Sequence, residues 1–169
     1  MDKQQVEQRT EEFFRGGLHC AEAVLAAVLE SQGVSGAEFS PRAASAFGGG
    51  VGRSKKELCG ALSGGLIALG IIQGRDIPDE SWDAVAATAE GLRSRFETCY
   101  GSTTCGPVLE RLGPQERMDK CVRLAANTAG LVFTALAGDQ DSPPAQACGC
   151  GCADLHAKPA PAKTGCGCK

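Results

Sequence analysis

Apolar residues recur at helical spacing along the chain as far as Ala137, and no segment shows the period of two that marks a β-strand. Glycine and proline divide this pattern into separate segments. Helices are predicted over residues 3–30, 41–47, 54–72, 78–100 and 114–137, with a short turn of helix after Cys105. Trp82 is expected in the buried stripe of the helix over 78–100, and Gly101 is expected to end that helix. The sequence therefore predicts an all-α domain, an irregular bundle of four to five helices.

The segment 54–72 is rich in small residues. Gly60, Gly64 and Ala68 recur four apart, which makes a groove that another helix backbone can approach closely, either in the same chain or in a second copy of it. A homo-oligomer is therefore possible. The uncharged stretch from Leu58 to Gly74 is shorter than the roughly 20 apolar residues of a membrane span and contains several glycines. It predicts a buried core helix and no membrane span.

The composition changes after Gly138. Residues 139–169 contain four prolines, one leucine and no aromatic residue, and they show no apolar periodicity. Such a segment buries too little apolar area to offset its ordering entropy. We therefore divide the chain into a helical domain, residues 1–138, and a flexible tail, residues 139–169, which we expect to add almost nothing to the stability of the metal-free protein.

The tail is dense in cysteine. Its sulfurs follow C-x-C-x-C and C-x-C spacing with glycine between them, and thiolates prefer soft ions such as zinc or copper(I), or iron–sulfur chemistry. This pattern predicts a soft-metal site, with His156 as an occasional further ligand. A metal-free redox reserve and a low-complexity tail with incidental cysteines are the alternatives. The predicted metal ligands are Cys148, Cys150, Cys152, Cys166 and Cys168.

The net charge of −3 argues against a nucleic-acid-binding protein, because phosphate binding requires concentrated lysine and arginine. Residues 1–12 are polar and contain no apolar segment of a signal peptide. A cytoplasmic protein is therefore expected. In that reducing compartment, numerous cysteines are metal ligands or redox thiols more often than structural disulfides.

The other five cysteines are spread singly through the domain. Cys20 is expected in the middle of the first helix, Cys59 and Cys121 in the second turn of later helices, and Cys105 in a loop. Their separation excludes a local metal finger, so only the fold can bring them together, and each taken alone could be a small core residue. Cys59 follows a predicted capping box at Ser54–Glu57 and several basic residues, which favours its thiolate.

The domain cysteines lie within a familiar series of motifs. These are His19-Cys20-Ala21-Glu22, Phe47-Gly-Gly-Gly50-Val-Gly52-Arg53, Cys59-Gly60-Ala61-Leu-Ser-Gly64, Gly101-Ser-Thr-Thr-Cys105, and Cys121. Over roughly residues 8–137 this series resembles the C_GCAxxG_C_C family of redox-active proteins, which is defined by four cysteines and a CGAxxG motif. The resemblance implies that Cys20, Cys59, Cys105 and Cys121 are the family's four cysteines, whereas Cys99 and the tail lie outside the pattern. A related domain in split-Soret cytochromes is associated with an iron–sulfur cluster, which leaves a cluster possible here.

Two neighbouring features have weaker implications. The segment Gly48–Gly52 lacks the spacing of a dinucleotide fingerprint and the lysine of a P-loop, so it is either a tight turn that directs the next helix or, with Arg53, a backbone anion site. His19 is adjacent to Cys20 in a predicted helix and therefore points elsewhere, although it could activate a thiol from another helix.

Together these patterns predict a redox-active protein. Cys20, Cys59, Cys105 and Cys121 would converge as a dithiol–disulfide centre or an iron–sulfur site, and the tail would bind a soft metal. The alternative is a non-catalytic zinc or copper carrier or buffer in which the domain is a scaffold, and a purely structural helical module is a third possibility. The sequence names neither the redox partner nor the metal donor, and it does not decide whether the protein is an enzyme.

Overall fold

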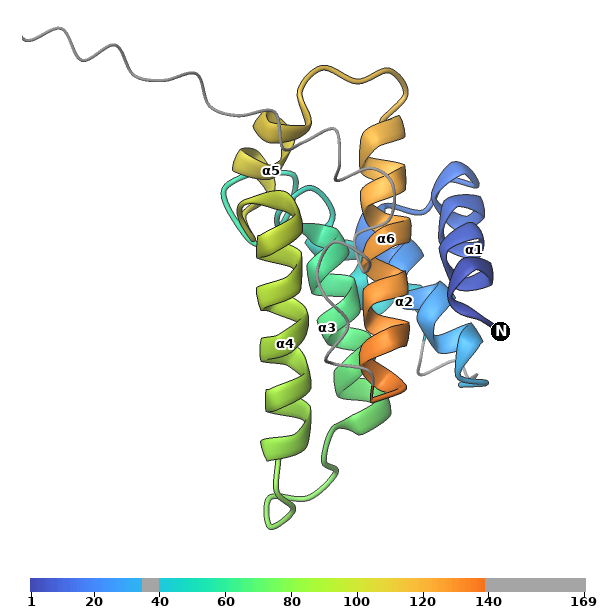
Figure 1. Ribbon diagram of the computed structural model, residues 1–169, viewed down its shortest axis with the longest axis vertical. Coiled ribbons are helices and arrows are strands. Elements are labelled where there is room, and N and C mark those ends of the chain that lie inside the picture. Colours follow the sequence, from blue (N-terminus) through green and yellow to red (C-terminus); the bar gives the residue numbers. More distant parts are fainter. Residues whose placement is uncertain (35–39, 139–169) are drawn as a thin grey trace, which may run out of the picture.

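The computed structural model describes residues 1–34 and 40–138. Within these ranges the chain forms helices and no strands, which confirms the predicted class (Figure 1). It forms seven helices, more than the four to five expected: α1 (Lys3–Arg15), α2 (Cys20–Ser31), the 3-10 helix η2 (Pro41–Phe47), α3 (Gly60–Gln73), α4 (Asp83–Tyr100), α5 (Cys105–Leu112) and α6 (Asp119–Leu136).

The predicted single helix over residues 3–30 is wrong, because the chain breaks at Gly16–His19 to give α1 and α2. Gly17 takes a left-handed backbone conformation with φ of 110°, which glycine adopts at little cost. The Glu22 carboxylate then accepts a hydrogen bond from the His19 N–H at 2.7 Å, which satisfies a backbone donor at the start of the new helix. This break places Cys20 at a helix terminus.

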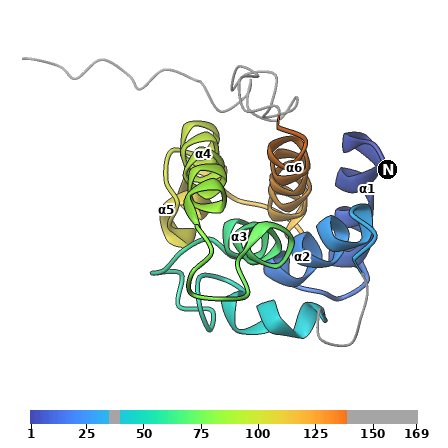
Figure 2. The ribbon, with the colours of Figure 1, turned by 90° about the horizontal axis from the view of Figure 1, so that it is seen from below.

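The helices form layers around α6. In the view of Figure 2, α4, α6 and α1 form one layer, α3 and α2 form a second, and η2 covers the far side of that second layer. Helix α6 packs against α1, α2, α3 and α4, and α2 packs against α3 and η2. The core lies between these layers and consists mainly of alanine, valine and leucine, with Phe96 as its largest fully buried side chain.

Glycines of α3 allow the closest contact between helices. A Cβ atom at Gly64 would overlap the carbonyl oxygen of Ala21 in α2, and one at Gly65 would lie 2.8 Å from a methyl carbon of Val132 in α6. The groove predicted on this helix is therefore filled by α2 of the same chain. No helix in the described ranges combines the length and hydropathy needed to cross a membrane.

Other helix starts differ from the prediction. Helix α4 begins at Asp83 rather than at Pro78, so Trp82, predicted in the buried stripe, precedes the helix and is 59% exposed. Helix α6 begins at Asp119 rather than at Pro114, because Arg117 and Met118 take left-handed conformations that interrupt the helix. The predicted stop of α4 at Gly101 is confirmed, with φ of 74°.

Candidate four-cysteine site

Four cysteines of the domain occupy equivalent places in four different helices. Cys20 and Cys105 are the first residues of α2 and α5, Cys59 is the N-cap of α3, and Cys121 lies in the first turn of α6. The predicted positions in the middle of a helix and in second turns are therefore wrong. A helix N-terminus carries partial positive charge and unpaired N–H groups. Each sulfur is thus attached where the backbone favours a negative group.

The first turn of α2 is hydrogen-bonded to η2. Besides accepting the His19 N–H, the Glu22 carboxylate accepts a hydrogen bond from the Ser45 hydroxyl of η2 at 2.5 Å. Gly48 follows η2 and lies against the His19 ring, since a Cβ there would be 3.3 Å from a ring carbon. These contacts fix the entry of the chain into α2, and with it Cys20.

A short backbone ladder holds Cys59 beside Cys105. The Cys59 N–H donates to the Thr103 carbonyl at 2.8 Å, and the Cys105 N–H donates to the Glu57 carbonyl at 2.9 Å. Leu58 and Thr104, between these bonds, form an isolated β-bridge. Residues 54–58 form a non-helical turn in which the carbonyls of Lys55 and Glu57 accept hydrogen bonds from the start of α5. The predicted capping box at Ser54–Glu57 therefore does not form, and α3 begins only at Gly60.

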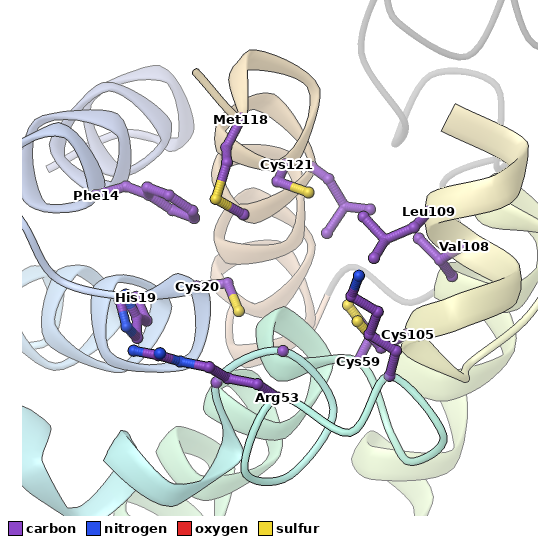
Figure 3. A pocket seen from close by; sticks show the side chains of 14 residues that line it. Phe14, His19, Cys20, Arg53, Cys59, Cys105, Val108, Leu109, Met118 and Cys121 are labelled. Carbon is purple, nitrogen blue, oxygen red and sulfur yellow. The ribbon is translucent and has the colours of Figure 1, made fainter. Parts of the chain in front are cut away.

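The four sulfurs line one cavity of about 340 Å³. In Figure 3, Cys59 and Cys105 lie together on the side of α5, Cys20 lies near the centre and Cys121 lies across the cavity on α6. Among the residues that the structure describes, no carboxylate contributes to the wall. The wall consists of Phe14, His19, Cys20, Gly48, Gly49, Arg53, Lys55, Cys59, Cys105, Val108, Leu109, Met118, Cys121 and Leu124.

Glycines make room beside the sulfurs. A Cβ atom at Gly60 would overlap the Cys20 sulfur, and one at Gly50 would lie 2.7 Å from the Cβ of Cys105. Cys20 therefore packs directly against the residue that follows Cys59. Both glycines are required for the cysteines to reach the same cavity.

Within residues 1–34 and 40–138, non-glycine residues with a left-handed backbone lie in the two loops that border the cavity. In the described ranges, the non-glycine residues with positive φ are Val51, Arg53, Lys55, Arg117 and Met118. Three of them, Arg53, Lys55 and Met118, line the cavity. Left-handed conformations cost non-glycine residues roughly 1–2 kcal/mol each and gather at functional sites.

The loop after η2 is a tight turn. The N–H groups of Gly52, Arg53 and Lys55 donate to the carbonyls of Ala46, Gly48 and Gly49 at 2.9–3.0 Å. Those amides are thus engaged within the loop, which supports the turn interpretation of this segment over the backbone anion site. The turn carries Arg53 across the mouth of the cavity toward His19 (Figure 3).

Three of the cavity thiols, those of Cys59, Cys105 and Cys121, have raised pKa values. Burial, followed by the neighbouring charge of Cys20, raises the pKa of Cys59 to about 12, although the amides of Ala61 and Leu62 act in the opposite direction. Burial is also the largest cause of the raised pKa values of Cys105 and Cys121, and Cys20 raises both further. The prediction that Cys59 favours its thiolate is therefore wrong for the metal-free protein, because desolvation outweighs the helix terminus.

These pKa values predict a loss of stability in alkali. Above the ordinary thiol pKa of about 8.5 the unfolded chain releases the Cys59 proton, whereas the folded chain retains it until about pH 12. The contribution of Cys59 to the free energy of unfolding of reduced, metal-free protein should be constant below that range and fall by about 1.4 kcal/mol per pH unit above it. Cys105 and Cys121, whose pKa values are also raised, add to this slope. Urea titrations between pH 8 and 10 measure this slope. Cys59→Ser should show a smaller slope, and equal slopes would contradict the assignment.

In the described part of the chain, no group of three or more cysteine, histidine or acidic side chains is placed to hold a single metal ion. Zinc bound by four cysteines needs every sulfur about 2.3 Å from the metal, which brings the sulfurs into mutual contact. The four thiols here form no disulfide bond and surround a cavity instead.

The remaining candidate residues differ in their placement. Cys99 is 2% exposed in the core cluster and does not line the cavity, whereas His19 does. His156 and the five tail cysteines, Cys148, Cys150, Cys152, Cys166 and Cys168, lie outside the described residues. Sequence reasoning named Lys55 as a basic residue close to Cys59, but did not place it near Cys105, where its charge partly opposes the rise in pKa that burial causes. It did not identify Gln115, which is hydrogen-bonded to Cys121.

The family model described as "Putative redox-active protein (C_GCAxxG_C_C)" matches residues 18–134, which include all four cavity cysteines. The chain belongs to this family. The match ends before the tail. Comparison with curated proteins and with solved structures found no significant match.

The structure explains the CGAxxG motif of this chain, residues Cys59 to Gly64. Cys59 provides a sulfur, Gly60 leaves space for the Cys20 sulfur, and Gly64 lets the backbone of α2 approach at Ala21. The motif therefore supplies one of the four sulfurs, makes room for a second and allows the helix contact that holds both in place.

Proposed function

We propose that the protein transfers electrons through an iron–sulfur cluster held by Cys20, Cys59, Cys105 and Cys121. The observation that supports this most directly is the shared cavity, in which four sulfurs from four helix N-termini meet without a carboxylate. Four cysteine thiolates are the usual ligands of [2Fe–2S] and [4Fe–4S] clusters. The redox activity described for the family is consistent with this proposal.

The residues present fit such a group. The donor set is entirely soft sulfur, which disfavours hard cations. The cavity of about 340 Å³ has space between its sulfurs, as a group with several metal atoms requires. The wall is predominantly apolar and includes Phe14, Leu109 and Met118. When bound, a cluster supplies one-electron transfer.

The charges of the chain favour a negatively charged group in the cavity. Four thiolates with their metals form a site of net negative charge. The N-termini of α2, α3, α5 and α6 stabilise that charge, because each carries partial positive charge. Arg53 and Lys55 add two full positive charges at the wall and make no ion pair in the described ranges. Since three of the thiols have raised pKa values, loading the site must release protons.

Reconstitution of the full chain tests the proposal. One variant replaces the five tail cysteines by serine, and the other replaces the four cavity cysteines by serine. After anaerobic incubation with iron and sulfide, the first variant should retain visible charge-transfer absorbance and bound iron, and the second should lose both. Absorbance that is lost in the variant without tail cysteines and kept in the variant without cavity cysteines would contradict the proposal.

A dithiol–disulfide centre is the second candidate, because the Cys20 sulfur packs against Gly60, directly after Cys59. The raised pKa of Cys59 opposes it, since the thiolate is the attacking nucleophile. If the wild-type protein binds no iron but two of its cavity thiols titrate reversibly with oxidised and reduced dithiothreitol, this candidate replaces the cluster.

We keep the tail as a separate soft-metal site, on the strength of its C-x-C-x-C and C-x-C spacing alone. In this proposal the tail takes up zinc or copper(I) in a reducing compartment such as the cytoplasm. Zinc and copper retained by the variant without cavity cysteines, and lost by the variant without tail cysteines, would support a carrier function alongside the redox site.

A further inference from the structure

Gln115 bridges two atoms of Cys121. Its side-chain nitrogen Nε2 donates a hydrogen bond to the Cys121 sulfur at 3.2 Å, and its oxygen Oε1 accepts one from the Cys121 backbone N–H at 3.0 Å. Both groups are partly buried. The side chain thus spans from the turn before α6 to the first turn of that helix.

The two bonds fix the orientation of the amide. Oxygen and nitrogen of a glutamine side chain are assigned from their partners. The Cys121 N–H can only donate, so Oε1 must face it, which leaves Nε2 directed at the sulfur. The hydrogen bond to the sulfur therefore follows from the hydrogen bond to the backbone.

Gln115 also replaces the missing cap of α6. Met118 occupies the N-cap position in a left-handed conformation and makes no side-chain hydrogen bond there. The Oε1 atom of Gln115 satisfies a backbone donor of the first turn instead. A capping role and a role at the sulfur are thus combined in one side chain, and a test must separate them.

We propose that Gln115 is a positioning residue that holds Cys121 in the cavity and raises the reduction potential of the redox site through its N–H···S hydrogen bond. This rests on the proposed function. Reduction adds negative charge to a site ligated by thiolate, and a hydrogen bond donated to the sulfur stabilises that charge more in the reduced state. Hydrogen bonds to ligating sulfurs are among the features that set such potentials.

Two substitutions separate the roles. Gln115→Glu keeps an oxygen that can accept the Cys121 N–H, and its charge suits a helix N-terminus, but it replaces the donor at the sulfur with a second oxygen. Gln115→Leu removes both hydrogen bonds. Arg117→Gln is the matched control, because it changes the net charge by the same amount at an exposed residue of the same turn that does not line the cavity.

The reduction potential of reconstituted protein is the first measurement. It should be lower in Gln115→Glu and in Gln115→Leu than in wild type, and nearly unchanged in Arg117→Gln. Only Gln115→Leu should unfold at lower urea concentration. A potential unchanged in Gln115→Glu, or lowered equally by Arg117→Gln, would show that Gln115 only caps α6 and would overturn the proposal.

A second measurement uses the reduced, metal-free protein. The rate at which iodoacetamide alkylates Cys121, followed by mass spectrometry at one fixed pH, should fall several-fold in Gln115→Glu, because the sulfur loses a donor that stabilises its anion. Alkylation of Cys105 in the same sample is the internal control. Equal Cys121 rates would overturn the proposal. This result does not depend on reconstitution, so failure to bind iron would count against the cluster and leave the test of Gln115 intact.

Discussion

Replacing Gly64 by alanine is expected to lower the free energy of unfolding by about 3 kcal/mol, because overpacking a tight contact forces backbone to move. The added Cβ would overlap the Ala21 carbonyl oxygen and lie 2.9 Å from its carbonyl carbon. These are backbone atoms of α2, so no flexible side chain can give way. Urea denaturation of the metal-free protein measures the effect.

Gly70 provides the matched control in the same helix. A Cβ atom there would meet nothing within 4 Å. Gly70→Ala should therefore stabilise the protein by roughly 0.5–1 kcal/mol, since alanine loses less backbone entropy than glycine in a helix. Equal effects of the two substitutions would show that the contact between α2 and α3 is looser than described.

Replacing Cys59 by serine is expected to abolish cluster binding, with at least a roughly tenfold loss of iron and of visible absorbance after reconstitution, because second-shell changes alone already cost metal sites about 10–100-fold. Cys59 is 6% exposed at the wall of the cavity, and no other sulfur can take its place on α3. The fold should persist, because Cys59 is the N-cap of α3 and serine is a preferred N-cap residue. Loss of iron can thus be separated from loss of structure.

Cys99→Ala is the control for this experiment. Cys99 is a buried cysteine of α4 that does not line the cavity, so the variant should bind as much iron as wild type. Full iron binding by Cys59→Ser, or its loss in Cys99→Ala, would show that the cluster is held by a different set of sulfurs. Circular dichroism of each variant verifies that the helices are intact.

Local patterns predicted the helical class and several element ends. Apolar periodicity identified the helices, and Gly101 ends α4 as expected, because glycine adopts the left-handed conformation of a helix stop at little cost. The break between α1 and α2 had a signal too, since Gly16-Gly17 precedes His19 and Glu22 lies three residues after it. The apolar residues continue at helical spacing across this break, because α1 and α2 both bury residues at that spacing. The pattern therefore predicted one helix over residues 3–30.

The order of the four cysteines and the CGAxxG motif also sufficed to assign the family and the candidate ligands. These features are read directly from residue identity and spacing. What the sequence could not place was each sulfur within its helix. Cys59 was expected inside a helix that begins near Ser54, but residues 54–58 pair with the start of α5, and such a long-range backbone pairing leaves no local periodicity.

Only the tertiary structure decided the environment of the sulfurs. The thiol pKa values depend on burial by helices that are distant in sequence, and this burial reversed the expectation for Cys59. The hydrogen bond from Gln115 exists because the left-handed turn at Arg117 and Met118 folds the chain back on itself. The sequence thus determined which elements form and which residues carry sulfur. The fold determined that four helix starts face one cavity, because that convergence depends on how Gly60 and Gly64 let α2 and α3 pack.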